Sequence, residues 1–210
     1  MTLRKKERVD DPHVRALNDL ARSLRVDALT AGPTAERFVP WFDPDSGGVG
    51  ARVLVLMESP GPRTVRAGDL GFSSEDNDDP TAAALRHARE RSGLTRSAYL
   101  RWNVVPWPLY DEAGSRRPPT MVDLDDARPA LSALLGLLPD LEVVVTVGAP
   151  ALNGIMRLIT SEPVDLARTP RVLGVPHPSP RNARQRTEAR ERLEHALASA
   201  VRDDSPSGPN

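Results

Sequence analysis

The chain has 210 residues, of which 39% are hydrophobic and 27% charged, and its formal net charge at pH 7 is −1. This length is sufficient for one sizeable core, and the composition is that of a folded protein. Because the charge is nearly balanced, any nucleic-acid function has to rest on local patches. The sequence contains no cysteine, which excludes disulfides, thiolate metal sites, iron–sulfur clusters and cysteine nucleophiles. It also has no long apolar run or signal-like start, so we expect a cytoplasmic monomer without a membrane partner.

Helical and strand patterns alternate along the chain. Apolar periodicity predicts helices over residues 11–29, 80–92, 124–138, about 148–158 and 183–201, and short apolar runs predict strands over Val53–Leu56, Tyr99–Val105, Val143–Val147 and Arg171–Val175. Strands separated by helices predict an α/β fold, a three-layer α/β/α sandwich around a four-stranded, mainly parallel sheet. We expect one domain over residues 1–202, with residues 1–10 mobile and residues 203–210 a disordered tail.

Three polar segments lie at the ends of three predicted strands. Met57–Pro62 follows the first strand, Asn103 lies late in the second, and Val175–Asn182 includes the end of the fourth and the loop after it. In parallel sheets, ligands bind at the carboxyl ends of the strands. The last segment contains Pro176, Pro178 and Pro180, which keep it out of helix and sheet and make a stiff loop that presents His177. The sequence therefore predicts one site at this edge of the sheet.

In this order, the three segments resemble the signature motifs of the uracil-DNA glycosylase superfamily, and the resemblance extends from about Arg52 to Val201. His177–Asn182 is most similar to the last motif of the single-strand-selective branch. Glu58–Pro62 looks like the first motif of the thermophilic, iron–sulfur branch, and Asn103 resembles the strand asparagine of that branch. That branch holds its cluster with four cysteines, which this chain lacks. The resemblance thus implies a cluster-free member with mixed features, which needs no metal or cofactor.

The resemblance implies that the protein hydrolyses the N-glycosidic bond of uracil or a related deaminated base in DNA and leaves an abasic site. The base leaves as an anion, and His177 would donate a hydrogen bond to its O2 as the charge develops. Glu58 would orient the attacking water or act electrostatically on the sugar. Met57 and Ser59 stand where the family usually has glycine and Asp or Asn, which weakens the case for water activation. The alternatives are structural roles. His177 would be a loop histidine that bonds the backbone, and Glu58 would be an N-cap or form a loop ion pair.

Met57, Ser59, Phe72 and Asn103 are the predicted substrate-binding residues. The amide of Asn103 offers one donor and one acceptor group, which suits O4 and N3–H of uracil. The alternative is a structural asparagine that bonds a neighbouring loop. Phe72 would stack on the flipped base, as aromatic rings do in base-flipping enzymes. Packing in the core is the alternative for this phenylalanine.

DNA contacts are expected from arginine, since Lys5 and Lys6 are the only lysines. Arg181 would enter the base stack or bind a phosphate. The other predicted DNA-binding residues are Pro60, Gly61, Ser179, Pro180 and Asn182. A solvated helix face is the alternative for the arginines that follow the loop. Because both lysines lie in the N-terminal segment, we expect direct hydrolysis rather than a Schiff-base lyase reaction.

The acidic segment Ser73–Asp79 lies near the predicted pocket in the sequence and would repel a duplex unless it points away. Two other functions therefore stay open. One is a non-catalytic nucleic-acid-binding module of the same fold, which the residues Met57 and Ser59 favour. The other is a hydrolase of free nucleotides or nucleosides, which the acidic segment and the near-neutral charge favour.

Overall fold

The computed structural model describes residues 2–30, 37–161, 169–178 and 186–201. The helices are α1 Thr2–Lys6, α2 Pro12–Thr30, α3 Pro62–Arg66, α4 Pro80–Ser92, α5 Met121–Gly136, α6 Ala149–Ile159 and α7 Arg186–Val201, and the strands are β1 Trp41–Phe42, β2 Val53–Met57, β3 Phe72–Ser73, β4 Tyr99–Asn103, β5 Val143–Val147 and β6 Arg171–Val175. Within this part of the chain, no helix is both long and apolar enough to cross a membrane.

The main sheet has four strands in the order β4-β2-β5-β6, and every neighbouring pair is parallel. All residues of β2, β4 and β5 are buried, although β4 is an edge strand, whereas the other edge strand, β6, is partly exposed. Continuous burial explains why the inner strands read as uninterrupted apolar runs. The predicted α/β fold with a four-stranded parallel sheet is confirmed.

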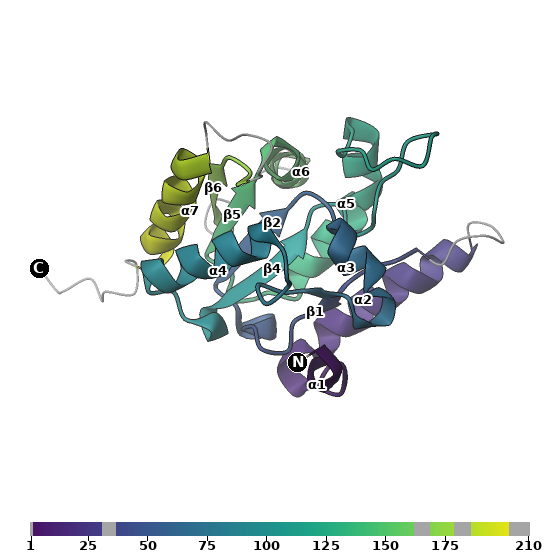
Figure 1. The fold of residues 1–210 in the computed structure, drawn as a ribbon, viewed down its shortest axis with the longest axis horizontal. Coiled ribbons are helices and arrows are strands. Elements are labelled where there is room, and N and C mark those ends of the chain that lie inside the picture. Colours follow the sequence, from purple (N-terminus) through teal and green to yellow (C-terminus); the bar gives the residue numbers. More distant parts are fainter. Residues whose placement is uncertain (1, 31–36, 162–168, 179–185, 202–210) are drawn as a thin grey trace, which may run out of the picture.

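Helices cover both faces of this sheet (Figure 1). Val53 and Val55 of β2 face α4 and α7, where they pack in one cluster with Leu85 and Leu193. The alternate residues of β2 point to the other face, where a second cluster contains residues of α2, α5 and α6. Because strand side chains alternate between faces, the two clusters divide the domain into the expected three layers.

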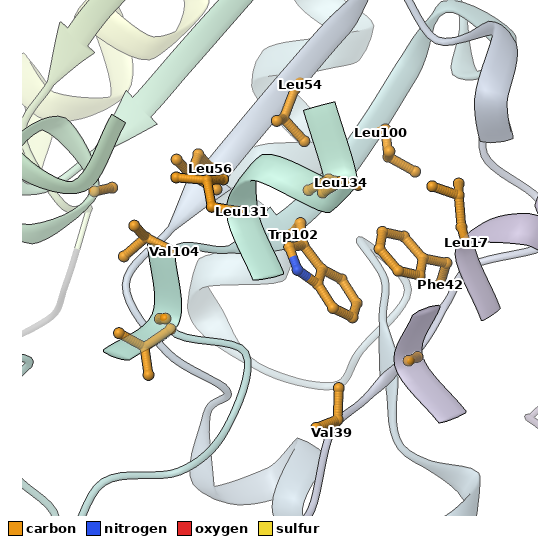
Figure 2. Close-up of a cluster of buried hydrophobic side chains, with 14 of the residues drawn as sticks. Leu17, Val39, Phe42, Leu54, Leu56, Leu100, Trp102, Val104, Leu131 and Leu134 are labelled. Carbon is orange, nitrogen blue, oxygen red and sulfur yellow. The ribbon is translucent and has the colours of Figure 1, made fainter. Parts of the chain in front are cut away.

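The second cluster is built around two stacked aromatic rings (Figure 2). The ring of Phe42 lies 3.7 Å from that of Trp102 between centroids, at an interplanar angle of 8°. Leu17 and Leu134 belong to the same cluster. Since Trp102 of β4 points into this core, its neighbours at alternate positions, Arg101 and Asn103, face the opposite side of the sheet.

The ends of the helices agree with local capping signals. The predicted helix over residues 80–92 is confirmed as α4, with the Asp79 carboxylate accepting a hydrogen bond of 2.8 Å from the backbone N–H of Ala82 and with Gly93 at φ 77° after its end. Helix α5 begins earlier than the predicted 124, because Thr120 and Asp123 form a reciprocal capping box. Strand β4 ends at Asn103, two residues before the predicted end.

Two features differ from the sequence-based expectation. Trp41–Phe42, expected within a loop, pairs with Phe72–Ser73 as a small parallel sheet. Residues 1–10 were expected to be mobile, but residues 2–6 form α1, and Lys5 is only 4% exposed. Its ammonium lies 2.7 Å from Asp43 Oδ1. This contact joins residues far apart in sequence, which local periodicity cannot indicate. The expected tail, residues 203–210, lies outside the described residues.

Candidate active site

A cavity of about 910 Å³ opens at the carboxyl ends of the strands. It is lined by parts of the segments 57–66, 79–81, 116–118, 148–150 and 175–177, together with Arg101. Strands β2, β5 and β6 run directly into three of these segments. The site predicted at this edge thus coincides with a cavity large enough for a nucleotide.

Glu58 is the first residue after β2, and its carboxylate is seated against the backbone at the start of α6. A Cβ atom on Gly148 would lie 2.3 Å from Glu58 Oε1, and Gly148 has φ 94°. The positive φ favours glycine at this position, and the Glu58 carboxylate occupies the space that a Cβ atom would fill. Burial raises the pKa of Glu58 above its ordinary value. A carboxylate of raised pKa beside a cavity is a suitable proton acceptor near neutral pH.

His177 follows β6 and lines the same cavity as Glu58. Its Nδ1 atom is buried and has no hydrogen-bond partner among the described residues. Burial lowers the pKa of His177, the charge of Arg101 lowers it further, and Asp79 acts in the opposite sense. The imidazole is therefore neutral at neutral pH, with ring nitrogens that can bind a ligand.

Met57 and Asn103 are register partners at the ends of β2 and β4. Met57 lines the cavity, whereas Asn103 is 4% exposed and is not among the lining residues. Within the described residues, no group is hydrogen-bonded to the side-chain amide of Asn103. The role of Asn103 in base recognition stays a prediction.

Phe72 lies in β3, opposite Trp41. It is 2% exposed, belongs to the same core cluster as Phe42 and Trp102, and does not line the cavity. The packing alternative therefore describes its observed surroundings, and stacking on a base stays a prediction. Ser179, Pro180, Arg181 and Asn182 lie outside the described residues.

Comparisons with known proteins agree with this geometry. The family profile described as the Uracil DNA glycosylase superfamily matches residues 44–200. The chain belongs to this superfamily. Its function is therefore of the DNA glycosylase type, an N-glycosidic hydrolase of DNA repair. No curated protein sequence matches the chain.

Among the solved structures that are similar to this chain, two serve as examples. The crystal structure of wild-type SMUG2 from Pedobacter heparinus is 12% identical, with a TM-score of 0.50 over 73% of this chain and 75% of that chain. The solution structure of a candidate uracil DNA glycosylase from Methanosarcina acetivorans is 13% identical, with a TM-score of 0.43 over 72% of this chain and 92% of that chain. At this identity, the SMUG2 structure supports the shared fold.

In this superfamily member, the first motif is contacted by an arginine from a distant loop. Arg116 donates hydrogen bonds to the hydroxyl of Ser59, at 3.3 Å, and to the carbonyl oxygen of Pro60. Its Nη1 atom is buried and has no partner among the described residues. Gly61 then caps α3. The sequence signal for this contact is weak: two adjacent arginines, Arg116 and Arg117, in the polar segment between β4 and α5.

Arg101 is a second lining residue that the sequence reasoning missed. It is 8% exposed and lies in β4, two residues before Asn103. The available signal was a charged residue between the apolar residues Leu100 and Trp102, since arginine is seldom fully buried unless it is paired.

The acidic segment Ser73–Asp79 is neutralised by internal contacts. Glu75 is 1% exposed and pairs with Arg89 at 2.8 Å. Burial opposes the ionisation of Asp76, but hydrogen bonds from Arg96 and Lys5 prevail and lower its pKa to about 2. Further along, Asp78 pairs with Arg63 and Asp79 caps α4. The expected repulsion of a duplex is therefore much reduced.

The cavity itself has a positive balance of charge. Among the described residues, its lining contains two carboxylates, Glu58 and Asp79, and five arginines. Two of these arginines, Arg63 and Arg117, pair with Asp78 and Asp123, which leaves Arg66, Arg101 and Arg116 without an ion-pair partner among the described residues. The same part of the chain contains no group of three or more His, Asp or Glu residues placed to hold a metal ion. The arrangement suits an anionic or oxygen-rich ligand.

Proposed function

We propose that the protein is a monofunctional DNA glycosylase that hydrolyses the N-glycosidic bond of uracil or a related deaminated base in DNA and leaves an abasic site. The observation that carries the proposal is the meeting of Glu58 and His177 at one cavity. Their pKa values are shifted in opposite directions, up for the carboxyl and down for the imidazole. Burial favours the neutral form of both groups, and titratable groups with shifted pKa values that line a cavity are typical of functional sites.

The reaction divides naturally between these two residues. The bond between C1′ and the base nitrogen breaks with its electron pair staying on the base, and His177 donates a hydrogen bond to the oxygen on which negative charge develops. Water forms the new bond to C1′, and its proton is taken by Glu58 and then passed to the base anion. The products are the neutral base and the abasic sugar.

The positive cavity supports a DNA substrate. Arginines at its mouth can bind the phosphates that flank a flipped nucleotide, as phosphate contacts dominate affinity for DNA. Arg66 is exposed, and Arg116 is held in place by its contacts with Ser59 and Pro60. We include Pro60 and Gly61 in this DNA-binding surface because they belong to the same loop.

The positions of the lysines support hydrolysis without a lyase step. A lyase needs an amine that attacks C1′ and forms a Schiff base. The ammonium of Lys5 is paired with Asp43 and Asp76, and that of Lys6 lies 4.0 Å from the centroid of the Trp41 ring. Neither lysine lines the cavity.

The decisive experiment is base release from oligonucleotides of one sequence that carry uracil or thymine at one position, as single and double strands. Alkaline cleavage reveals abasic sites. We expect cleavage of the uracil strand alone, and no cleavage without alkali. Deoxyuridine and its 5′-monophosphate are tested in parallel. Binding of the oligonucleotide without base release would favour a non-catalytic module, and release from the mononucleotide alone would favour a nucleotide hydrolase.

A further inference from the structure

Arg101 differs from the other buried cations of this domain. It lies in β4 at the floor of the cavity and is 8% exposed. Its Nη1 atom donates a hydrogen bond of 2.6 Å to the carbonyl oxygen of Ser74. Its Nε atom is buried without a partner, and no carboxylate of the described residues lies within ion-pair distance of the guanidinium. Part of its donor capacity is therefore unused.

Nearby cations with a structural role form ion pairs with carboxylates. Lys5 pairs with Asp43 and Asp76, and Arg89 pairs with Glu75. Burial of a cation without an anion or a full set of acceptors is expensive. Since Arg101 faces the cavity and holds the loop through one nitrogen only, its remaining donors point to an acceptor on a ligand.

We propose that Arg101 binds a carbonyl oxygen of the flipped base, opposite the oxygen bound by His177, and so restricts the enzyme to bases that carry two carbonyl oxygens. This inference rests on the proposed glycosylase function and names its substrate class. A guanidinium has five N–H donors and no acceptor, so it can donate a hydrogen bond to a carbonyl oxygen but has no acceptor for an amino group. Uracil and xanthine have two carbonyl groups, whereas hypoxanthine has one and cytosine pairs one carbonyl with an amino group.

Arg101 also contributes to the rate in this arrangement. When the bond to C1′ breaks, the electron pair that stays on the base spreads over both carbonyl oxygens. A neutral imidazole at one oxygen and a guanidinium at the other both bind this anion more strongly than the neutral base, which is the condition for acceleration. Burial lowers the pKa of His177, and the positive charge of Arg101 lowers it further.

The test compares Arg101→Gln and Arg101→Lys with the wild type in single-turnover assays on matched oligonucleotides. We expect Arg101→Gln to lose about 100-fold on uracil, the loss typical of one missing donor to a developing anion. The loss on 5-fluorouracil is expected to be smaller, because the fluorine already stabilises the anion. Arg101→Lys keeps the charge and recovers part of the rate. Wild-type protein is expected to prefer xanthine over hypoxanthine, and Arg101→Gln to lose this preference.

Arg89→Gln is the matched control, because Arg89 anchors the same loop through Glu75 but does not line the cavity. It is expected to lower thermal stability and to leave the ratio of rates between substrates unchanged. Equal losses of Arg101→Gln on uracil and 5-fluorouracil, or an unchanged preference for xanthine, would overturn the proposal and leave Arg101 as a loop anchor.

A binding measurement keeps the inference testable where Arg101→Gln does not fold. Wild-type protein is titrated with free uracil, xanthine and hypoxanthine, and we expect tighter binding of the two bases with two carbonyl groups. Equal affinity for xanthine and hypoxanthine would overturn the proposal. The failure of the proposed function looks different, because wild-type protein would then release no base from any oligonucleotide, whatever its affinity for free bases.

Discussion

Two groups of charged side chains meet at the segment Ser73–Asp79, and they differ in how their charges are used. The first, here called the paired cluster, consists of Lys5, Asp43, Glu75, Asp76, Arg89 and Arg96. Its members hold one another: Arg96 lies 2.8 Å from Asp43 and Arg89 lies 2.8 Å from Glu75. The second is the cavity, where Glu58, Arg101 and His177 have no ion-pair partner among the described residues.

Charges with ion-pair partners contribute to stability, whereas charges without partners are expected to act in function. A buried charge that has partners serves the folded state, and removing one member leaves the others uncompensated. A buried polar group without partners costs stability and is expected at functional sites. Substitutions in the paired cluster should therefore change stability most, and substitutions in the cavity should change chemistry most.

The largest effect is expected from Asp43→Ala in the paired cluster. Asp43 is 3% exposed and contacts both Lys5 and Arg96. Its loss should reduce the free energy of unfolding by about 3–5 kcal/mol, because the buried ammonium of Lys5 and the partly buried guanidinium of Arg96 each lose one of their carboxylate partners. Urea unfolding measures this change. Base release per folded molecule should stay near that of the wild type, and a selective loss of activity without a loss of stability would contradict the division of roles.

His177→Ala should show the opposite pattern in the cavity. We expect base release to fall about 10²–10³-fold, or roughly 2.7–4 kcal/mol of transition-state stabilisation, as for a lost oxyanion-hole donor. The unfolding midpoint should hardly change, because Nδ1 has no partner within the described residues. Single-turnover rates measure the chemical step apart from product release. Turnover equal to that of the wild type would refute the role of His177 as the anion donor.

Glu58→Gln should lower the single-turnover rate about 100-fold, the lower end of the range for a lost acid–base group. Binding of a non-cleavable uracil analogue should change little, since the amide keeps the shape. The raised pKa of Glu58 means that the folded state penalises the carboxylate, so Gln should increase thermal stability at neutral pH. This gain should vanish below the ordinary pKa of glutamate, where the carboxyl is neutral in both states.

The same pKa shift predicts the pH profile. As the pH falls, Glu58 takes up a proton at a higher pH than an ordinary glutamate, so the wild-type rate should decline on the acid side above the usual glutamate range. The pKa of His177 is lowered mainly by burial, so its protonation is shifted to lower pH than that of an ordinary histidine. The acid limb should be absent in Glu58→Gln. An identical limb in the variant would assign it to another group.

The smallest effect is expected from Arg157→Ala, which removes an exposed ion pair with Asp125 at 2.6 Å. Surface pairs are screened by water and contribute little. The melting temperature and the rate of base release should match those of the wild type. A clear loss of stability would show that exposure is a poor guide to the value of an ion pair in this protein.

The sequence was sufficient to predict the main sheet, since the apolar runs Val53–Leu56 and Val143–Val147 are long enough to identify buried strands and the rules of parallel sheets place their carboxyl ends together. Pro80 in the first turn and Gly93 after the last residue located α4 for the same reason, because such signals act over a few residues. Placing Glu58 and His177 at one edge followed from topology alone.

Tertiary structure decided which charged side chains form ion pairs within the fold and which remain without a partner in the cavity. Lys5 reaches Asp43, Arg89 reaches Glu75, and Arg116 reaches Ser59, all across sequence separations that no periodic pattern records. Phe72 shows the same limit, because a lone aromatic residue in a polar stretch can pack in the core or face a ligand. Burial and ion pairing depend on what folds against a residue, and hydrophobic patterning reports only which face of its own element it occupies.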